Sequence, residues 1–217
     1  MVISDKDLQS LANFMGYGDP DRARVFFMGI EEHNTFTDFD FVEYGKYTIK
    51  PNPKGTPTKG VTENMQCHIY RKLVAEVEEG EIFESGIHCF NYYPVGAKNV
   101  TTLPTGLERF GSKAKLYDYI EHETRRIHFL RAFIEEKILG PKKLLFVFGK
   151  ESRTIAKRLL TDVKFSEPYE GWVTKNGKPS PIQWSEDKLI WLTGHPSHRW
   201  ITSEVVEKIA DIIVDKA

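Results

Sequence analysis

The segment Lys188-Leu-Ile-Trp-Leu-Thr-Gly-His-Pro-Ser197 carries the clearest information on the fold of this chain. The run up to Thr193 is apolar and typical of a buried strand, and Gly194 and Pro196 end that strand. His195 is therefore expected at the carboxyl end of the strand. Because ligands of open α/β sheets bind beyond the carboxyl ends of the strands, His195 is a candidate site residue.

Three more apolar segments stop abruptly in the same way. They are Arg24-Val-Phe-Phe-Met28, which Gly29 closes, Ile87-His-Cys-Phe90, which runs into Asn91, and Leu144-Leu-Phe-Val-Phe148, which Gly149 and Lys150 follow. Helical patterns separate these strands, and they span residues 4–15, 62–79, 115–138, 152–160 and 203–215. Strands that alternate with helices predict an α/β fold, a three-layer α/β/α sandwich around a central, mainly parallel four-stranded sheet.

Length and composition limit the class of protein. The chain has 217 residues, of which 40% are hydrophobic and 28% charged, and this suits one domain over residues 1–217 with a buried core. No apolar stretch reaches membrane-spanning length, and the first residues have no signal-peptide pattern, so we expect a cytoplasmic protein with no membrane partner. Two cysteines, Cys67 and Cys89, are too few for a disulfide framework or a four-cysteine cluster. Because the net charge is −1, a nucleic-acid partner needs a local basic patch.

If the four strands are parallel, the polar residues that follow them lie along one edge of the sheet. Glu31 or Glu32 can supply a carboxylate there, and the amide of Asn91 can read the edge of a planar heterocycle. His195 can donate to a developing anion or move a proton, and Lys150 near a helix N-terminus can hold a phosphate. Each residue also has a structural interpretation: His195 as a turn residue before proline, Asn91 as a turn cap, and the charged residues as solvated loop groups.

The order of these motifs resembles the uracil-DNA glycosylase superfamily. Its members have a first strand that ends in Gly and a short loop, a second strand that ends in a base-reading Asn, and a late strand that ends in His-Pro-Ser or Asn-Pro-Ser. The corresponding segments here are Val25-Phe-Phe-Met-Gly-Ile-Glu31, Phe90-Asn-Tyr-Tyr-Pro94 and Gly194-His-Pro-Ser197, and the resemblance covers residues 24–215. It implies a uracil-DNA glycosylase-like fold, to which a hairpin expected near residues 172–184 is an addition.

The resemblance implies a role for each matching residue. Glu31 stands where active members commonly have Asp or Asn, and there it orients the hydrolytic water, while Asn91 reads the base and His195 stabilises the departing base. An aromatic residue of the long loop after the first strand stacks on the base, and the segment after His-Pro-Ser enters the DNA minor groove. The stacking candidates are Phe41 and Phe36, and the candidate DNA contacts are Lys150, Ser197, Arg199 and Trp200.

The function that the resemblance implies is hydrolysis of the N-glycosidic bond of uracil or another deaminated base in DNA, as in base excision repair. We expect a monomer that binds single- or double-stranded DNA and uses no metal and no cofactor, since the iron–sulfur members require four cysteines. The first motif lacks the Pro of most members, and Glu31 is one methylene longer than Asp. Two alternatives stay open: a non-catalytic nucleic-acid or nucleotide-binding protein that keeps the glycosylase fold, and a Glu/His hydrolase of a nucleoside-like small molecule.

Overall fold

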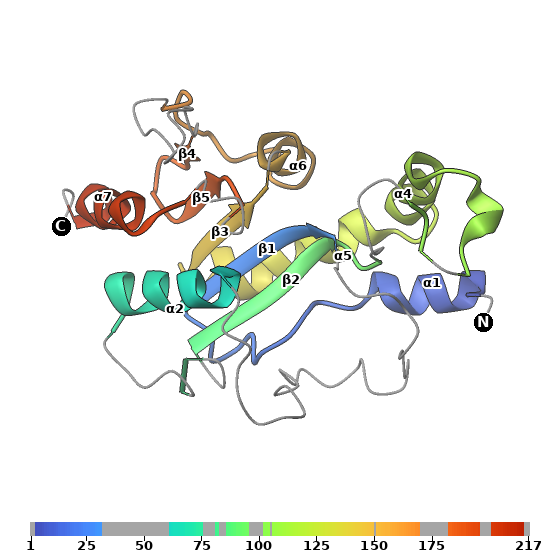
Figure 1. Cartoon of the computed structure of the whole chain (residues 1–217), viewed down its shortest axis with the longest axis horizontal. Helices are drawn as coiled ribbons and strands as arrows, with labels where there is room; N and C mark the ends of the chain where they lie inside the picture. The colour runs from blue at the N-terminus through green and yellow to red at the C-terminus, as the bar shows by residue number, and fades with distance from the viewer. Residues whose placement is uncertain are drawn as a thin grey trace.

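The computed structural model describes residues 3–31, 61–75, 81–82, 86–95, 102–104, 106–149, 151–169, 182–195 and 201–214. Within these ranges six α-helices accompany one β-sheet (Figure 1). The helices are α1 (Asp5–Ala12), α2 (Val61–Leu73), α4 (Lys113–His122), α5 (Arg126–Ile134), α6 (Ser152–Leu159) and α7 (Ser203–Val214). The strands are β1 (Val25–Glu31), β2 (Ile87–Tyr93), β3 (Leu144–Phe148), β4 (Gln183–Trp184) and β5 (Ile190–Thr193).

The five strands form one sheet in the order β2-β1-β3-β5-β4. Strands β2, β1, β3 and β5 are parallel, as the sequence predicts, and β4 pairs antiparallel with β5 through Gln183 and Trp184. The sequence predicts four strands, and this number is wrong because β4 forms a fifth strand at the edge of the sheet. A two-residue strand is too short to show an alternation of polar and apolar residues, so its sequence predicts only an irregular hairpin. Most of that hairpin, residues 170–181, lies outside the described residues.

Helices cover both faces of the sheet. Successive side chains of a strand point to opposite faces. In β1, Phe26 and Met28 join a core cluster with residues of α1, α4, α5 and α6, whereas Val25 and Phe27 join a second cluster with residues of α2 and α7. Burial of these apolar side chains is the main source of stability. Because described helices cover both faces of the sheet, the ends of the parallel strands are the expected place for a ligand.

Strands β1 and β2 run further than the sequence predicts. The apolar runs end at Met28 and Phe90, but the ladder continues, with Gly29 paired to Asn91 and Glu31 paired to Tyr93. Pairing between two established strands outweighs the weak strand preference of Gly and Asn. The expectation that Gly29 ends the first strand is therefore wrong, and Asn91 is a strand residue.

The helix predicted as one unit over residues 115–138 is divided in the structure. Helix α4 ends at His122, α5 begins at Arg126, and a π-helical turn follows over Glu135–Leu139. The chain turns at Arg125, whose φ of 61° lies in the left-handed region. No Gly or Pro marks this turn in the sequence, so the apolar spacing alone predicts a continuous helix.

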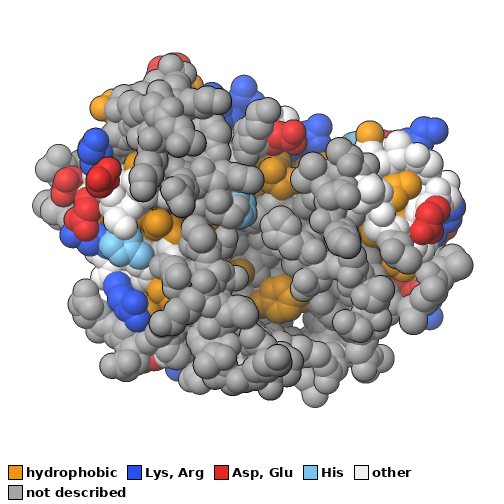
Figure 2. Space-filling model, viewed as in Figure 1, with side chains coloured by type: hydrophobic (Ala, Val, Ile, Leu, Met, Phe, Trp, Pro, Cys, Tyr) orange, Lys and Arg blue, Asp and Glu red, His pale blue; other side chains and the backbone are white. Residues whose placement is uncertain are grey.

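The described surface has mixed charge. Figure 2 shows Lys or Arg side chains beside Asp or Glu side chains on the described part of the visible face. Two large apolar side chains among the described residues are exposed, Phe129 and Tyr169. Across the described ranges, every helix is too short or too polar to cross a membrane.

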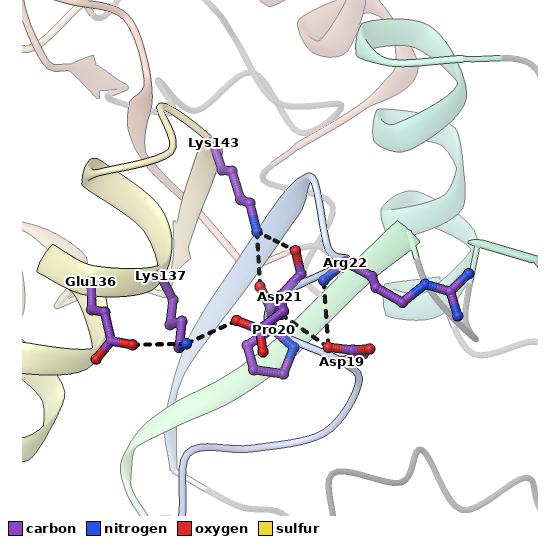
Figure 3. A network of polar contacts seen from close by, with 7 residues as sticks. All are labelled: Asp19, Pro20, Asp21, Arg22, Glu136, Lys137 and Lys143. Atoms are coloured by element: carbon purple, nitrogen blue, oxygen red, sulfur yellow. Dashed lines mark hydrogen bonds and ion pairs between the residues drawn. The ribbon is translucent and has the colours of Figure 1, made fainter.

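A polar network joins the chain segments at the amino ends of β1 and β3 (Figure 3). The ammonium of Lys143 donates to the main-chain oxygens of Pro20 and Asp21, at 2.8 and 3.0 Å. The ammonium of Lys137 contacts the carboxylates of Asp21 and Glu136, both at 2.8 Å. The hydrogen bond from Lys137 lowers the pKa of Asp21, although an exposed ion pair of this kind stabilises little. The network lies at the opposite end of the strands from the candidate site.

Candidate active site

The strand order favours a ligand at the carboxyl ends of β1 and β3. From β1 the chain crosses to β2 on one side, and β3 then lies on the other side of β1. Ligands of open α/β sheets bind where successive connections leave in opposite directions in this way. The residues at this point are 29–31 at the end of β1, and Phe148 and Gly149 at the end of β3.

The carboxamide of Asn91 lies across the neighbouring strand β1. Asn91 stands in register with Gly29, so the two residues are side by side in the sheet. A Cβ atom placed on Gly29 would be only 2.1 Å from Oδ1 and 3.3 Å from Cγ of Asn91. The Asn91 side chain therefore fills the space that a side chain at position 29 would take, and it is half-buried there.

The main chain of Asn91 is held by a buried arginine. Arg126, the first residue of α5, is 1% exposed. Its guanidinium donates to the main-chain oxygens of Asn91 at 2.7 Å and Tyr92 at 3.1 Å. It also donates to the main-chain oxygens of Ala12 at 2.7 Å and Phe14 at 2.5 Å. One side chain thus ties the end of β2 to the end of α1.

The imidazole of His195 lies beside the carboxyl end of β3. His195 follows β5, which ends at Thr193, and its ring packs edge-on against the ring of Phe148. The ring centroids are 6.2 Å apart and the ring planes meet at 65°. Because Phe148 is buried and His195 is half-buried, the imidazole has a fixed neighbour on one side and remains partly accessible.

These placements bring two of the predicted site residues toward one point. The Asn91 carboxamide lies over β1 and the His195 ring lies beside the last residue of β3, and β1 and β3 are adjacent strands. Adjacent strands are about 4.8 Å apart. Glu31 is the last residue of β1, and its backbone pairs with Tyr93 at the same end of the sheet.

The other predicted site residues lie outside the described part of the chain. They are Phe36, Phe41, Lys150, Ser197, Arg199 and Trp200. Their predicted roles in base stacking and DNA contact stay predictions.

A buried polar cluster supports the end of β2. The Glu121 carboxylate of α4 accepts hydrogen bonds from the hydroxyl of Tyr93 and, at 2.6 Å, from Nη1 of Arg158. The ring of Tyr93 stacks on that of Tyr117, with centroids 3.6 Å apart. Burial and the Glu121 carboxylate raise the pKa of Tyr93, and burial raises the pKa of Tyr92 to about 12. Both phenols are therefore protonated at neutral pH, and the hydroxyl of Tyr93 is the one that donates to Glu121.

Sequence reasoning missed the two charged residues that support Asn91 and Tyr93. Arg126 lies on the inward face of α5, four residues before Leu130 and eight before Ile134, which are both buried. Glu121 follows the buried Ile120 on α4 and is itself 8% exposed. The signal that could have found them is a charged residue on the inward face of a predicted helix. A charged side chain buried there requires hydrogen-bond partners inside the protein.

The carboxamide of Asn91 and the imidazole of His195 are groups that can form hydrogen bonds, and an imidazole can also transfer a proton. In the described ranges, no three His, Cys, Asp or Glu side chains gather closely enough to hold a metal ion.

Comparison of the chain with protein-family models, curated proteins and solved structures finds no match.

Proposed function

We propose that this chain is a DNA glycosylase with a uracil-DNA glycosylase-like fold, which removes uracil or another deaminated base from DNA. One observation carries the proposal: the carboxamide of Asn91 lies over β1 and the imidazole of His195 lies beside the end of the adjacent strand β3. Because adjacent strands are about 4.8 Å apart, groups that lie over β1 and beside the end of β3 are close enough to contact one ligand. Both side chains also stand at the point where the topology favours a ligand.

The reaction breaks the bond between C1′ of the sugar and the base nitrogen. The electron pair of that bond leaves with the base as an anion, a water oxygen bonds to C1′, and the proton that this water loses passes through solvent to the departing base. His195 donates a hydrogen bond to the base oxygen on which negative charge accumulates, and preorganised donors of this kind contribute about 3–4 kcal/mol. Asn91 holds the edge of the base, and Glu31 orients the water and offsets positive charge on the sugar.

DNA binding completes the proposal. The target nucleotide leaves the base stack before it reaches such a site, which costs a few kcal/mol, and less in a mismatch or a single strand. Phe41 or Phe36 stacks on the flipped base, and Lys150, Ser197, Arg199 and Trp200 contact the DNA. Because the net charge of the chain is −1, these contacts act locally rather than through a basic field.

A base-release assay tests this function. The substrates are single- and double-stranded oligonucleotides that carry uracil, hypoxanthine or xanthine. We expect release from at least one substrate, a loss of about 10²–10³-fold with His195→Ala, and a comparable loss with Glu31→Gln. The matched control is His128→Ala, since His128 is exposed on α5 and distant from the site in sequence.

Each other outcome has a distinct meaning. Failure of the wild-type protein to release a base from any of these substrates overturns the glycosylase proposal. DNA binding that weakens as salt rises, without release, supports the non-catalytic alternative instead. Cleavage of free nucleosides without DNA binding supports the small-molecule hydrolase.

A further inference from the structure

We infer that Gly29 is a specificity-determining position, because the absence of a side chain there sets the orientation of the Asn91 carboxamide. The inference rests on the proposed function, in which that carboxamide reads the base. It concerns a residue that takes no part in the reaction itself. Two features fix the orientation of the carboxamide: a steric fit at position 29, and the hydrogen bonds that Arg126 makes to the backbone.

The steric fit is between Gly29 and Asn91. A Cβ on Gly29 would lie 2.1 Å from Asn91 Oδ1 and 3.3 Å from Cγ, and among the described residues, apart from the two chain neighbours, no other atom would come within 4 Å. Gly29 lies in regular strand pairing, with its φ outside the left-handed region, so the backbone itself does not require glycine. The glycine at this position therefore makes room for one group, the carboxamide of Asn91.

The hydrogen bonds of Arg126 explain why a larger residue at position 29 must rotate the Asn91 carboxamide away from β1. The guanidinium of Arg126 fixes the main-chain oxygens of Asn91 and Tyr92, at 2.7 and 3.1 Å, and is 1% exposed. Strand β2 is also paired with β1 along this stretch. Because the Asn91 backbone cannot retreat, rotation of its side chain is the way to relieve the clash. Rotation moves the amide donors and acceptor away from β1.

The consequence concerns recognition rather than the reaction step. A carboxamide carries a donor nitrogen and an acceptor oxygen on the same carbon, so it matches a base edge that offers an acceptor beside a donor. Such a bidentate match discriminates between base edges by about 10- to 100-fold. A carboxamide that no longer lies over β1 loses this match, although His195 remains in place.

A double-variant cycle tests the inference, with Gly29→Ala, Asn91→Ala and the combination of the two. Urea unfolding measures stability, and release of uracil relative to cytosine from oligonucleotides measures selectivity. We expect Gly29→Ala to lower the urea midpoint and to reduce selectivity by about 10- to 100-fold. The combined variant should be no less stable and no less selective than Asn91→Ala alone, because the only clashing atoms are gone. NMR should show a shifted side-chain amide signal of Asn91 in Gly29→Ala.

The control is Gly140→Ala, since Gly140 is exposed at the end of a helical turn with a φ of −57°. It should leave both selectivity and the Asn91 amide signal unchanged. The inference is overturned if Gly29→Ala keeps wild-type selectivity, or if the stability losses of the two single variants add in the combined one. If the wild-type protein releases no base, the proposed function fails, while the unfolding cycle and the amide signal still decide whether Gly29 positions Asn91.

Discussion

Replacing Arg126 with methionine is expected to remove a large part of the stability of this protein. Methionine retains a flexible, unbranched apolar side chain but has no hydrogen-bond donor. The guanidinium is 1% exposed and donates to the main-chain oxygens of Ala12, Phe14, Asn91 and Tyr92. The substitution removes the donor from all four oxygens, of which those of Ala12, Phe14 and Tyr92 are in buried hydrogen bonds and that of Asn91 is in a partly buried one.

The size of the effect follows from these four contacts. A buried polar group that loses its partner costs about 1–3 kcal/mol. We take the low end for each oxygen, because removal of a buried charge relieves its own desolvation. The total is about 4 kcal/mol, against about 5–15 kcal/mol for the stability of a whole domain. With an m-value of about 2–3 kcal/mol/M, the urea midpoint falls by about 1.3–2 M.

The assay is urea unfolding at 25 °C followed by tryptophan fluorescence, for which the fully buried Trp191 is a suitable reporter. The control is Arg125→Met, because Arg125 is the neighbouring residue and is exposed. We expect Arg126→Lys to lie between wild type and Arg126→Met, since one ammonium cannot reach all the oxygens that a guanidinium spans. A loss below about 1 kcal/mol in Arg126→Met would refute the reasoning.

Two further predictions concern pH and helix capping. The ring nitrogens of His88 face the main-chain oxygens of Met15 and Gly18, and burial lowers the pKa of this imidazole. On acidification His88 is therefore protonated in the unfolded chain before it is protonated in the folded protein. The free energy of unfolding should therefore fall as the pH drops below about 6.5. Between pH 7 and 5 the urea midpoint of His88→Gln should fall less steeply than that of the wild-type protein. Equal slopes in the two proteins would contradict this prediction. Ser4→Ala should cost about 1 kcal/mol in thermal unfolding, because Ser4 and Asp7 form a capping box, and an unchanged Tm would exclude that contribution.

The sequence predicts the parallel core of the fold well because its strands are fully buried. The runs that end at Met28 and Phe148 are continuous stretches of apolar residues, and His88 alone interrupts the run that ends at Phe90. Such runs are typical of parallel sheets covered on both faces. Chain connectivity then places their carboxyl ends together, and this prediction needs no knowledge of side-chain contacts. The same reasoning predicts that His195 and Asn91 lie at this edge of the sheet.

The rest of the site depends on contacts between residues far apart in the sequence. Strand β1 extends through Gly29 because Gly29 pairs with Asn91 of β2. The local sequence around Gly29 cannot predict this pairing. The turn at Arg125 has no Gly or Pro, so helical spacing continues through it. Arg126 bonds to oxygens more than 100 residues earlier in the chain, at Ala12 and Phe14. Tertiary structure alone creates these interactions.

The link between α1 and β2 has a consequence for how the chain can be shortened. The motifs of the site begin with β1 at Val25, so a fragment that starts there contains all of the predicted chemistry. It lacks the oxygens of Ala12 and Phe14, which accept two of the hydrogen bonds of the Arg126 guanidinium. That guanidinium would then remain buried with part of its donors unsatisfied, at the position where it holds Asn91. The smallest fragment with an intact site therefore includes an N-terminal helix that contributes no reacting group.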